Sequence, residues 1–125
     1  MRRIVITGVG LITALGTGTE KTWKALLNGE CGINKIESFD TSNQAVHIAG
    51  EVRDFNPDDY IEKKELKKLG RFSQFAIAAS KMAVEDAKLD INDSNATRIG
   101  VMIGTGIGGL EIIESEIIKM HEKGP

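Results

Sequence analysis

Apolar residues along this chain recur with two different periods, and the changes of period mark strands and amphipathic helices. A β-branched run at residues 3–7 leads into a glycine turn and predicts a first strand. Helical spacing of apolar residues follows and predicts a helix that begins at residues 17–19 and ends before Gly29. Glu20 lies three residues after Thr17, which predicts a capping box at the start of that helix.

The middle of the chain is irregular before it becomes helical. Val46, Ile48, Gly50 and Val52 alternate with other residues, which predicts a short strand at 46–52. Residues 58–69 predict a short, highly charged helix that ends at Gly70. A long helix is expected from Arg71 to Lys88. Alanine dominates its apolar face, so we expect another segment to pack closely against it.

A turn-rich loop precedes a second strand–turn–helix pattern at the end of the chain. An apolar run at 99–103 predicts a buried strand; four glycines follow it, and then a helix over 110–122. The resulting order, β-α-β-α-α-β-α, indicates an α/β protein whose first and last strands pair in parallel. Three strands make a thin sheet. We therefore expect residues 1–125 to be the incomplete opening part of a larger domain.

Composition narrows the class of protein. The chain has 125 residues, of which 41% are hydrophobic and 27% charged, as in a single globular domain. Its net charge of −2 argues against nucleic acid as a partner, and no apolar run is long enough to span a membrane. The basic, then apolar, N-terminus superficially resembles a signal peptide, but Gly8 and Gly10 weaken that interpretation. A single cysteine fits a reducing compartment, and we expect a cytoplasmic location.

The glycine turn at 104–109 permits two interpretations. Gly104, Gly106 and Gly109 match the dinucleotide-binding fingerprint in its strand–turn–helix setting. The acidic residue that completes this fingerprint stands about 20 positions further on, beyond residue 125. The fingerprint also usually marks the first βα unit, where this chain has Thr13 in place of the third glycine. A dinucleotide-binding oxidoreductase domain stays open as the alternative, beside glycines that only permit a tight turn.

Five blocks of sequence together carry a family resemblance. They are residues 3–10 (RIVITGVG), 22–27 (TWKALL), 39–42 (FDTS), 71–74 (RFSQ) and 98–109 (RIGVMIGTGIGG). In this order they resemble the N-terminal part of β-ketoacyl-acyl carrier protein synthases, most of all the type II elongating enzymes of bacterial fatty acid synthesis. The resemblance covers essentially the whole chain. It implies a thiolase-like fold with two similar α/β halves, of which this chain holds part of the first.

The chemistry that the resemblance implies is a decarboxylative Claisen condensation of malonyl-acyl carrier protein with an acylated enzyme cysteine. The family's cysteine and two histidines lie in motifs downstream of residue 125, so we expect no catalytic residue and no activity in this chain alone. No cofactor and no metal are expected. The implied partners are acyl carrier protein and a second copy in a homodimer. A carrier-binding fragment without activity is a further alternative.

Basic residues cluster before the long helix, at Lys63, Lys64, Lys67, Lys68 and Arg71. Their spacing places them on one side of a helix, and a solvated helix face is the ordinary interpretation of such a run. The resemblance implies instead that Lys64, Lys67 and Lys68 dock the acidic helix of acyl carrier protein. Leu69 and Gly70 stand where relatives often have Met-Asp, which affects how these lysines are oriented.

Ile107 matches a position that lines the acyl-chain pocket in related synthases, where its rotamer opens or closes the tunnel. An ordinary core isoleucine beside the glycine turn is the alternative. Cys31 follows a helix and has Glu30 beside it, which disfavours a thiolate, so we expect a small packing residue. His47 and His121 have no partner at metal-ligand spacing and are expected at the surface or its boundary.

Overall fold

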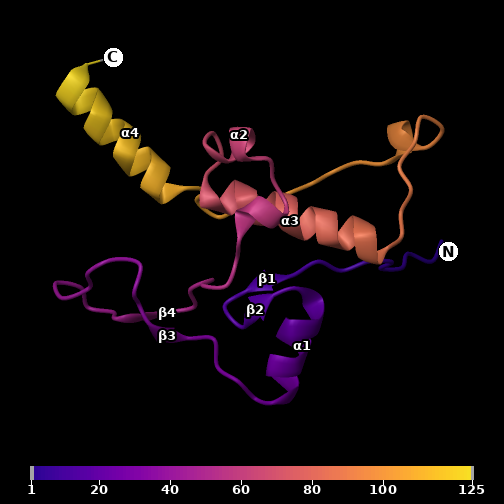
Figure 1. Ribbon diagram of the computed structural model, residues 1–125, viewed down its shortest axis with the longest axis horizontal. Helices are drawn as coiled ribbons and strands as arrows, with labels where there is room; N and C mark the ends of the chain where they lie inside the picture. Colours follow the sequence, from indigo (N-terminus) through magenta and orange to yellow (C-terminus); the bar gives the residue numbers. More distant parts are fainter. Residues whose placement is uncertain (1, 125) are drawn as a thin grey trace. The chain divides into compact units, whose positions relative to one another are not determined.

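The computed structural model describes residues 2–124, which fall into two compact units. Of the described residues, one unit consists of 2–56 with 79–89, and the other of 57–78 with 90–124. The elements, in chain order, are β1 (Ile12–Thr13), β2 (Gly16–Thr17), α1 (Thr19–Leu27), β3 (Asn34–Lys35), β4 (Ile48–Ala49), η1 (Pro57–Asp59), α2 (Lys63–Leu66), α3 (Arg71–Asp86), η2 (Ala96–Arg98) and α4 (Leu110–Lys123), where η denotes a 3₁₀ helix (Figure 1).

Two short antiparallel hairpins form the sheets of the first unit. In one, β1 pairs with β2 so that Ile12 faces Thr17, and α1 follows directly (Figure 1). In the other, β3 pairs with β4, and Asn34 faces Ala49. The strand predicted at 46–52 is thus confirmed, although only its middle residues pair.

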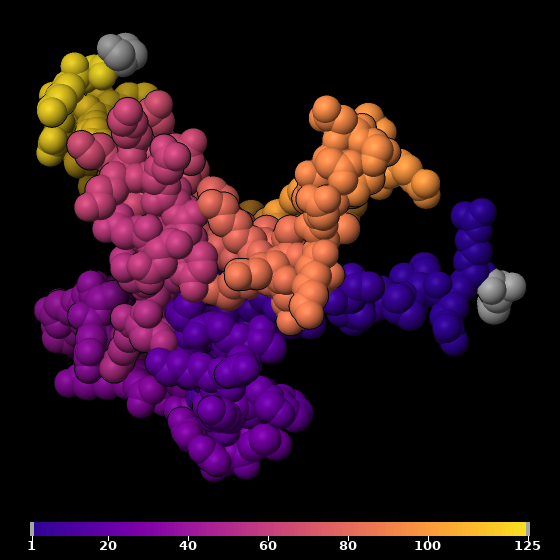
Figure 2. Space-filling view, turned by 45° about the vertical axis from the view of Figure 1, so that its right-hand side comes forward, coloured from indigo at the N-terminus to yellow at the C-terminus, as the bar shows by residue number. Residues whose placement is uncertain are grey.

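The predicted parallel pairing of a first and a last strand is wrong for the described residues. Residues 3–7 and 99–103 have no strand partner there, and all pairing is antiparallel. Ile4 is 95% exposed and Met102 97% exposed, and Figure 2 shows the indigo N-terminal segment as a thin extended run of atoms. Periodicity reports a preference for extended backbone, but a strand forms only where a neighbour supplies hydrogen bonds.

The helix at 19–27 is confirmed, whereas its predicted capping box is wrong. Gly18 is the N-cap, with no side-chain hydrogen bond, and the Thr17 hydroxyl donates instead to Asp54 Oδ1 at 3.2 Å. Thr22 and Ala25 are the buried residues of α1, while Trp23 stays 59% exposed. The β1–β2 hairpin packs against α1 on the side that carries Thr22 and Ala25, and it therefore buries these two small residues.

The close packing predicted for the alanine face of α3 is confirmed. The N-terminal segment runs along residues 79–87 at the C-terminal end of α3 (Figure 1). A Cβ at Gly8 would collide with the Ala83 carbonyl oxygen and stand 2.6 Å from the Ala87 nitrogen. The Val9 N–H also donates to Asp86 Oδ2 at 2.9 Å. Glycine at position 8 therefore permits a backbone-to-backbone approach that a side chain would block.

In the second unit, the single helix predicted at 58–69 is two short pieces. The 3₁₀ helix η1 ends at Asp59, and Glu62 has extended backbone (φ −63°, ψ 139°) that interrupts the helix before α2. Ile61, between them, is only 5% exposed, so the interruption places an apolar side chain in the interior. The helices predicted at 71–88 and 110–122 are confirmed as α3 and α4.

Candidate functional site

The basic segment, residues 63–71, lies in the second unit. Lys64 belongs to α2, and Lys67 is the C-cap of α2. Lys68 follows, and its backbone N–H donates to the Glu65 carbonyl oxygen at 2.9 Å. All three lysine side chains are exposed, and within residues 2–124 none of them forms an ion pair. The structure therefore places the three lysines in one exposed segment, although α2 itself ends before Lys67. Their docking role stays a prediction.

The C-terminal end of the basic segment is held against α3. The Gln74 side-chain amide donates to the Leu69 carbonyl at 2.9 Å, and Leu69 is half-buried. The Arg71 guanidinium lies 5.0 Å from the centre of the Phe75 ring, within the range of a cation–π contact. The segment therefore has a fixed end beside α3 and exposed cations before it.

Gly70 joins the basic segment to the glycine turn through shared neighbours. A Cβ at Gly70 would collide with Ile112 Cδ1 and lie 3.0 Å from Phe72 Cε1. A Cβ at Gly109 would lie 3.0 Å from the same Phe72 atom and 3.1 Å from Ile112 Cδ1. Phe72 and Ile112 thus occupy the space that a side chain at either glycine would need. The two predicted sites are connected inside this unit.

The glycine turn itself is exposed on the side that carries Ile107. Ile107 is 72% exposed, and in the described part of the chain nothing lies within 4 Å of a Cβ built at Gly104 or Gly106. Gly108 has a φ of +81°, which favours glycine, and its N–H donates to Thr105 Oγ1 at 3.0 Å. Among the described residues, Ile107 therefore does not occupy a core position. Its place in an acyl pocket stays a prediction.

Cys31 is not the packing residue that we expected. It is exposed, and its Sγ atom lies 3.9 Å from the Ile33 carbonyl oxygen. The chain leaves α1 through Gly29, with a φ of +68°, and the loop that follows is largely exposed. His47 and His121 are exposed as predicted, with His47 Nδ1 3.2 Å from Thr41 Oγ1. No group of potential metal ligands occurs among residues 2–124.

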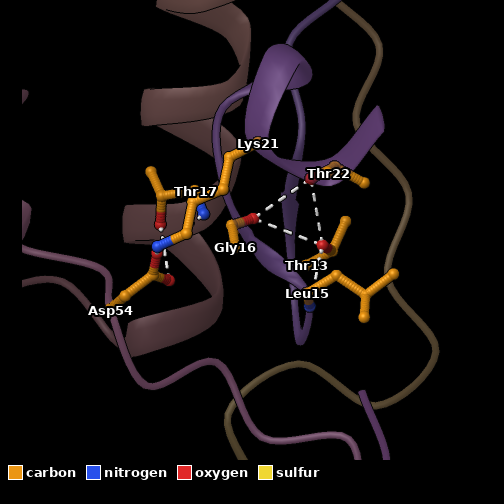
Figure 3. Close-up of polar contacts among 7 residues, drawn as sticks. All are labelled: Thr13, Leu15, Gly16, Thr17, Lys21, Thr22 and Asp54. Carbon is orange, nitrogen blue, oxygen red and sulfur yellow. Dashed lines mark hydrogen bonds and ion pairs between the residues drawn. The ribbon is translucent and has the colours of Figure 1, made fainter. Parts of the chain in front are cut away.

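The sequence analysis did not identify Asp54, whose carboxylate binds two residues at the start of α1 in the first unit. Its carboxylate accepts hydrogen bonds from Lys21 Nζ at 2.5 Å and from the Thr17 N–H at 3.1 Å (Figure 3). The Lys21 hydrogen bond is the main cause of a pKa below the ordinary value for this carboxyl, and the Thr17 N–H adds to it. The partners lie 33 and 37 residues away in sequence, so no local signal announces them. This cluster fixes backbone and offers no free reactive group.

The model of the family described as β-ketoacyl synthase, N-terminal domain, matches residues 1–124. The chain therefore belongs to the β-ketoacyl synthase family. The match covers the glycine turn as well, and nothing in it supports the dinucleotide-binding oxidoreductase alternative.

Relatives and solved structures agree with the family match. The chain is 48% identical over 124 residues to 3-oxoacyl-[acyl-carrier-protein] synthase 2 of Staphylococcus aureus (strain N315), covering 99% of this chain and 30% of that protein. The ishigamide ketosynthase/chain length factor aligns with a TM-score of 0.79 and 34% identity over 98% of this chain and 30% of its own.

A third likeness is a structure described as a type II PKS acyl-carrier protein in complex with its ketosynthase bound to the hexaketide. Its TM-score is 0.74 and its identity 25%, over 96% of this chain and 30% of that one. These structures confirm the predicted fold class, a partial α/β thiolase-like domain. The chain spans about a third of the length of the relatives that it matches.

Proposed function

We propose that the complete protein is a 3-oxoacyl-[acyl carrier protein] synthase of fatty acid elongation. The 48% identity to the Staphylococcus aureus synthase over 99% of the chain is the observation that carries this proposal. In the proposed reaction, malonyl-acyl carrier protein loses CO₂, and the resulting carbanion attacks an enzyme-bound acyl thioester. A carbon–carbon bond forms, the enzyme thiolate leaves, and the acyl chain grows by two carbons.

Residues 2–124 contribute recognition to this reaction and not its nucleophile. Cys31 is exposed in a loop after α1, away from any helix N-terminus that would favour a thiolate. The chain expressed alone is therefore expected to be inactive, in keeping with its share of 30% of the relative's length.

Docking of acyl carrier protein is the role that we propose for Lys64, Lys67 and Lys68. Their exposure and lack of ion pairs within residues 2–124 leave three cationic groups available for an acidic partner. Complementary charge of this kind accelerates encounter and orients the partner. The neighbour described as a complex of an acyl-carrier protein with its ketosynthase supports a partner of this class.

Ile107 is proposed to contact the growing acyl chain. Its exposed side chain at the tip of a glycine turn presents an apolar surface, and the glycines on either side leave it room to change rotamer. We further propose that the complete protein acts in the cytoplasm as a homodimer. Among the described residues, no helix has the length and apolar character needed to cross a bilayer.

Condensation by the purified complete protein tests the proposed function. Acyl-acyl carrier protein and radiolabelled malonyl-acyl carrier protein are supplied together, and both CO₂ release and the length of the product chain are measured. The expected result is one CO₂ released for each chain extended by two carbons. If the protein binds both carriers but does not produce a lengthened acyl chain, the carrier-binding alternative is correct. Reactions that lack the acyl primer show how much CO₂ is released without condensation.

A further inference from the structure

Phe72 is the second residue of α3, and its ring lies beside the glycine turn of the second unit. A Cβ built at Gly109 would lie 3.0 Å from ring atom Cε1, and one built at Gly108 would lie 3.7 Å from Cζ. Gly109 itself is buried, whereas the Phe72 side chain is 38% exposed. The ring therefore covers the end of the turn from which α4 begins.

The rest of the turn has little to hold it. One side-chain hydrogen bond, from the Gly108 N–H to Thr105 Oγ1 at 3.0 Å, spans it, and Gly104 and Gly106 have open space around them within the described residues. Glycine backbone loses more conformational freedom on ordering than any other residue, so a turn rich in glycine needs packing to adopt one conformation. Phe72 and Ile112 supply that packing at residues 108 and 109.

We propose that Phe72 is a positioning residue for Ile107, and that it acts by clamping Gly108 and Gly109. This inference rests on the proposed function, because it concerns how Ile107 meets an acyl chain. Ile107 directly precedes the clamped pair, so the position of its Cα follows from theirs. Without the ring, the turn samples more conformations, and Ile107 is no longer held in the one arrangement that admits a long chain.

Gly70 approaches the same atoms of Phe72 and Ile112 that Gly109 approaches. A Cβ at Gly70 would collide with Ile112 Cδ1 and stand 3.0 and 3.2 Å from Phe72 Cε1 and Cδ1. The backbone at Gly70 is not in the left-handed region, so alanine is allowed there by conformation and excluded only by space. Gly70→Ala therefore pushes Ile112 and Phe72 away without removing either, which gives a second and independent way to disturb the clamp.

The experiment compares Phe72→Leu and Gly70→Ala with Phe55→Leu in the complete protein. Phe55 is a buried phenylalanine of the first unit, 7% exposed, and its replacement controls for a general loss of stability. Two quantities are measured for each variant. The first is amide hydrogen exchange across residues 104–112, and the second is kcat/KM for acyl carrier protein primers of two to twelve carbons.

We expect both clamp variants to speed exchange at Gly108 by about tenfold, as local opening does. They should also lower kcat/KM for primers of eight or more carbons by about five- to tenfold, with less than a twofold change for two-carbon primers, because small misplacements at a reacting site are costly. Phe55→Leu should lower the melting temperature without either effect. An active wild type whose clamp variants leave exchange and length dependence unchanged would overturn the proposal.

Failure of the proposed function looks different. If the wild-type protein does not condense any primer, the function is wrong, while the exchange measurement still decides whether Phe72 holds the turn. If Phe72→Leu does not fold, Gly70→Ala carries the test, since it retains every side chain of the clamp. A uniform loss of activity at all chain lengths, together with unchanged exchange at Gly108, makes Phe72 an ordinary packing residue and overturns its positioning role.

Discussion

Gly10 lies directly against Ala79, so closely that a Cβ on Gly10 would collide with the Ala79 carbonyl oxygen. The same Cβ would stand 2.8 Å from both the Ala83 nitrogen and Met82 Cβ. Backbone atoms of a helix cannot turn aside as the end of a side chain can. The contact therefore requires glycine at position 10.

Gly10→Ala is expected to lower the free energy of unfolding of the complete protein by about 1–3 kcal/mol or more, the usual cost of overpacking. Gly100→Ala is the matched control, because no atom of residues 2–124 lies within 4 Å of a Cβ at that position and its backbone is not left-handed. Denaturant melts of the two variants provide the measurement. Equal stability of both would mean that the N-terminal segment does not pack on α3.

Helical periodicity predicted α1, α3 and α4 well, because the pattern that defines a helix lies within the helix itself. The alanine face of α3 also predicted the close approach of another segment, which Gly8 and Gly10 make. A strand cannot be predicted from its own pattern alone, and the strands expected at 3–7 and 99–103 do not form among the described residues. Their pairing depends on neighbours remote in sequence, and the described residues supply none.

The candidate site shows the same limit. The sequence predicted the lysines on one side of a single helix over 58–69, whereas α2 ends at Leu66, so Lys67 and Lys68 lie outside it. Ile107 was assigned from a resemblance, and neither burial nor spacing could have shown that Phe72 packs on Gly109. Contacts between residues 72 and 109 depend on tertiary structure, as do those of Asp54 with Lys21 and Thr17.

Glu51 makes the stability of the β3–β4 hairpin depend on pH in the acidic range. Hydrogen bonds from the Ser38 hydroxyl, the Glu37 N–H and Arg53 lower the pKa of this carboxyl to about 2, from an ordinary 4.5. A carboxyl whose folded pKa is lowered stabilises the fold above its unfolded pKa and loses that contribution as pH falls through its folded pKa. Glu51 therefore stabilises the hairpin above pH 4.5 and ceases to do so towards pH 2.

Glu51→Gln is accordingly expected to weaken the pH dependence of stability between pH 4.5 and pH 2 and to lower stability at neutral pH. Arg53 would then lose a partner that it now holds at 2.9 Å. Glu116→Gln is a suitable control, because Glu116 forms an ion pair with Lys119, and both side chains are exposed on α4. Denaturant melts from pH 2 to pH 7 compare the variants. A wild-type slope in Glu51→Gln would show that this carboxyl does not tie the hairpin together.

Charge reversal of Lys64, Lys67 and Lys68 to glutamate tests docking in the complete protein. Each single change should raise KM for carrier-bound substrates by about two- to tenfold, because charges at the rim of an interface act mainly on association. The increase should be largest at low ionic strength, where charges are least screened. Small thioester substrates without a carrier should react almost as before.

Lys24→Glu provides the matched control for these reversals, since Lys24 is an exposed helical lysine of the other unit. It changes net charge equally and should leave KM for the carrier unchanged. Equal losses with carrier-bound and small substrates would mean that the three lysines maintain structure and do not dock the carrier.

Ile107→Phe tests the acyl pocket. A larger side chain in space that a long acyl chain needs costs about 1–3 kcal/mol, which corresponds to a loss of about five- to 150-fold in rate. The loss should grow with chain length, from slight for two carbons to large for eight or more. Because Ile107 is 72% exposed within the described residues, the substitution should change the melting temperature little. Rates across primer lengths, measured beside a melting curve, decide the matter, and a loss independent of length would remove Ile107 from the pocket.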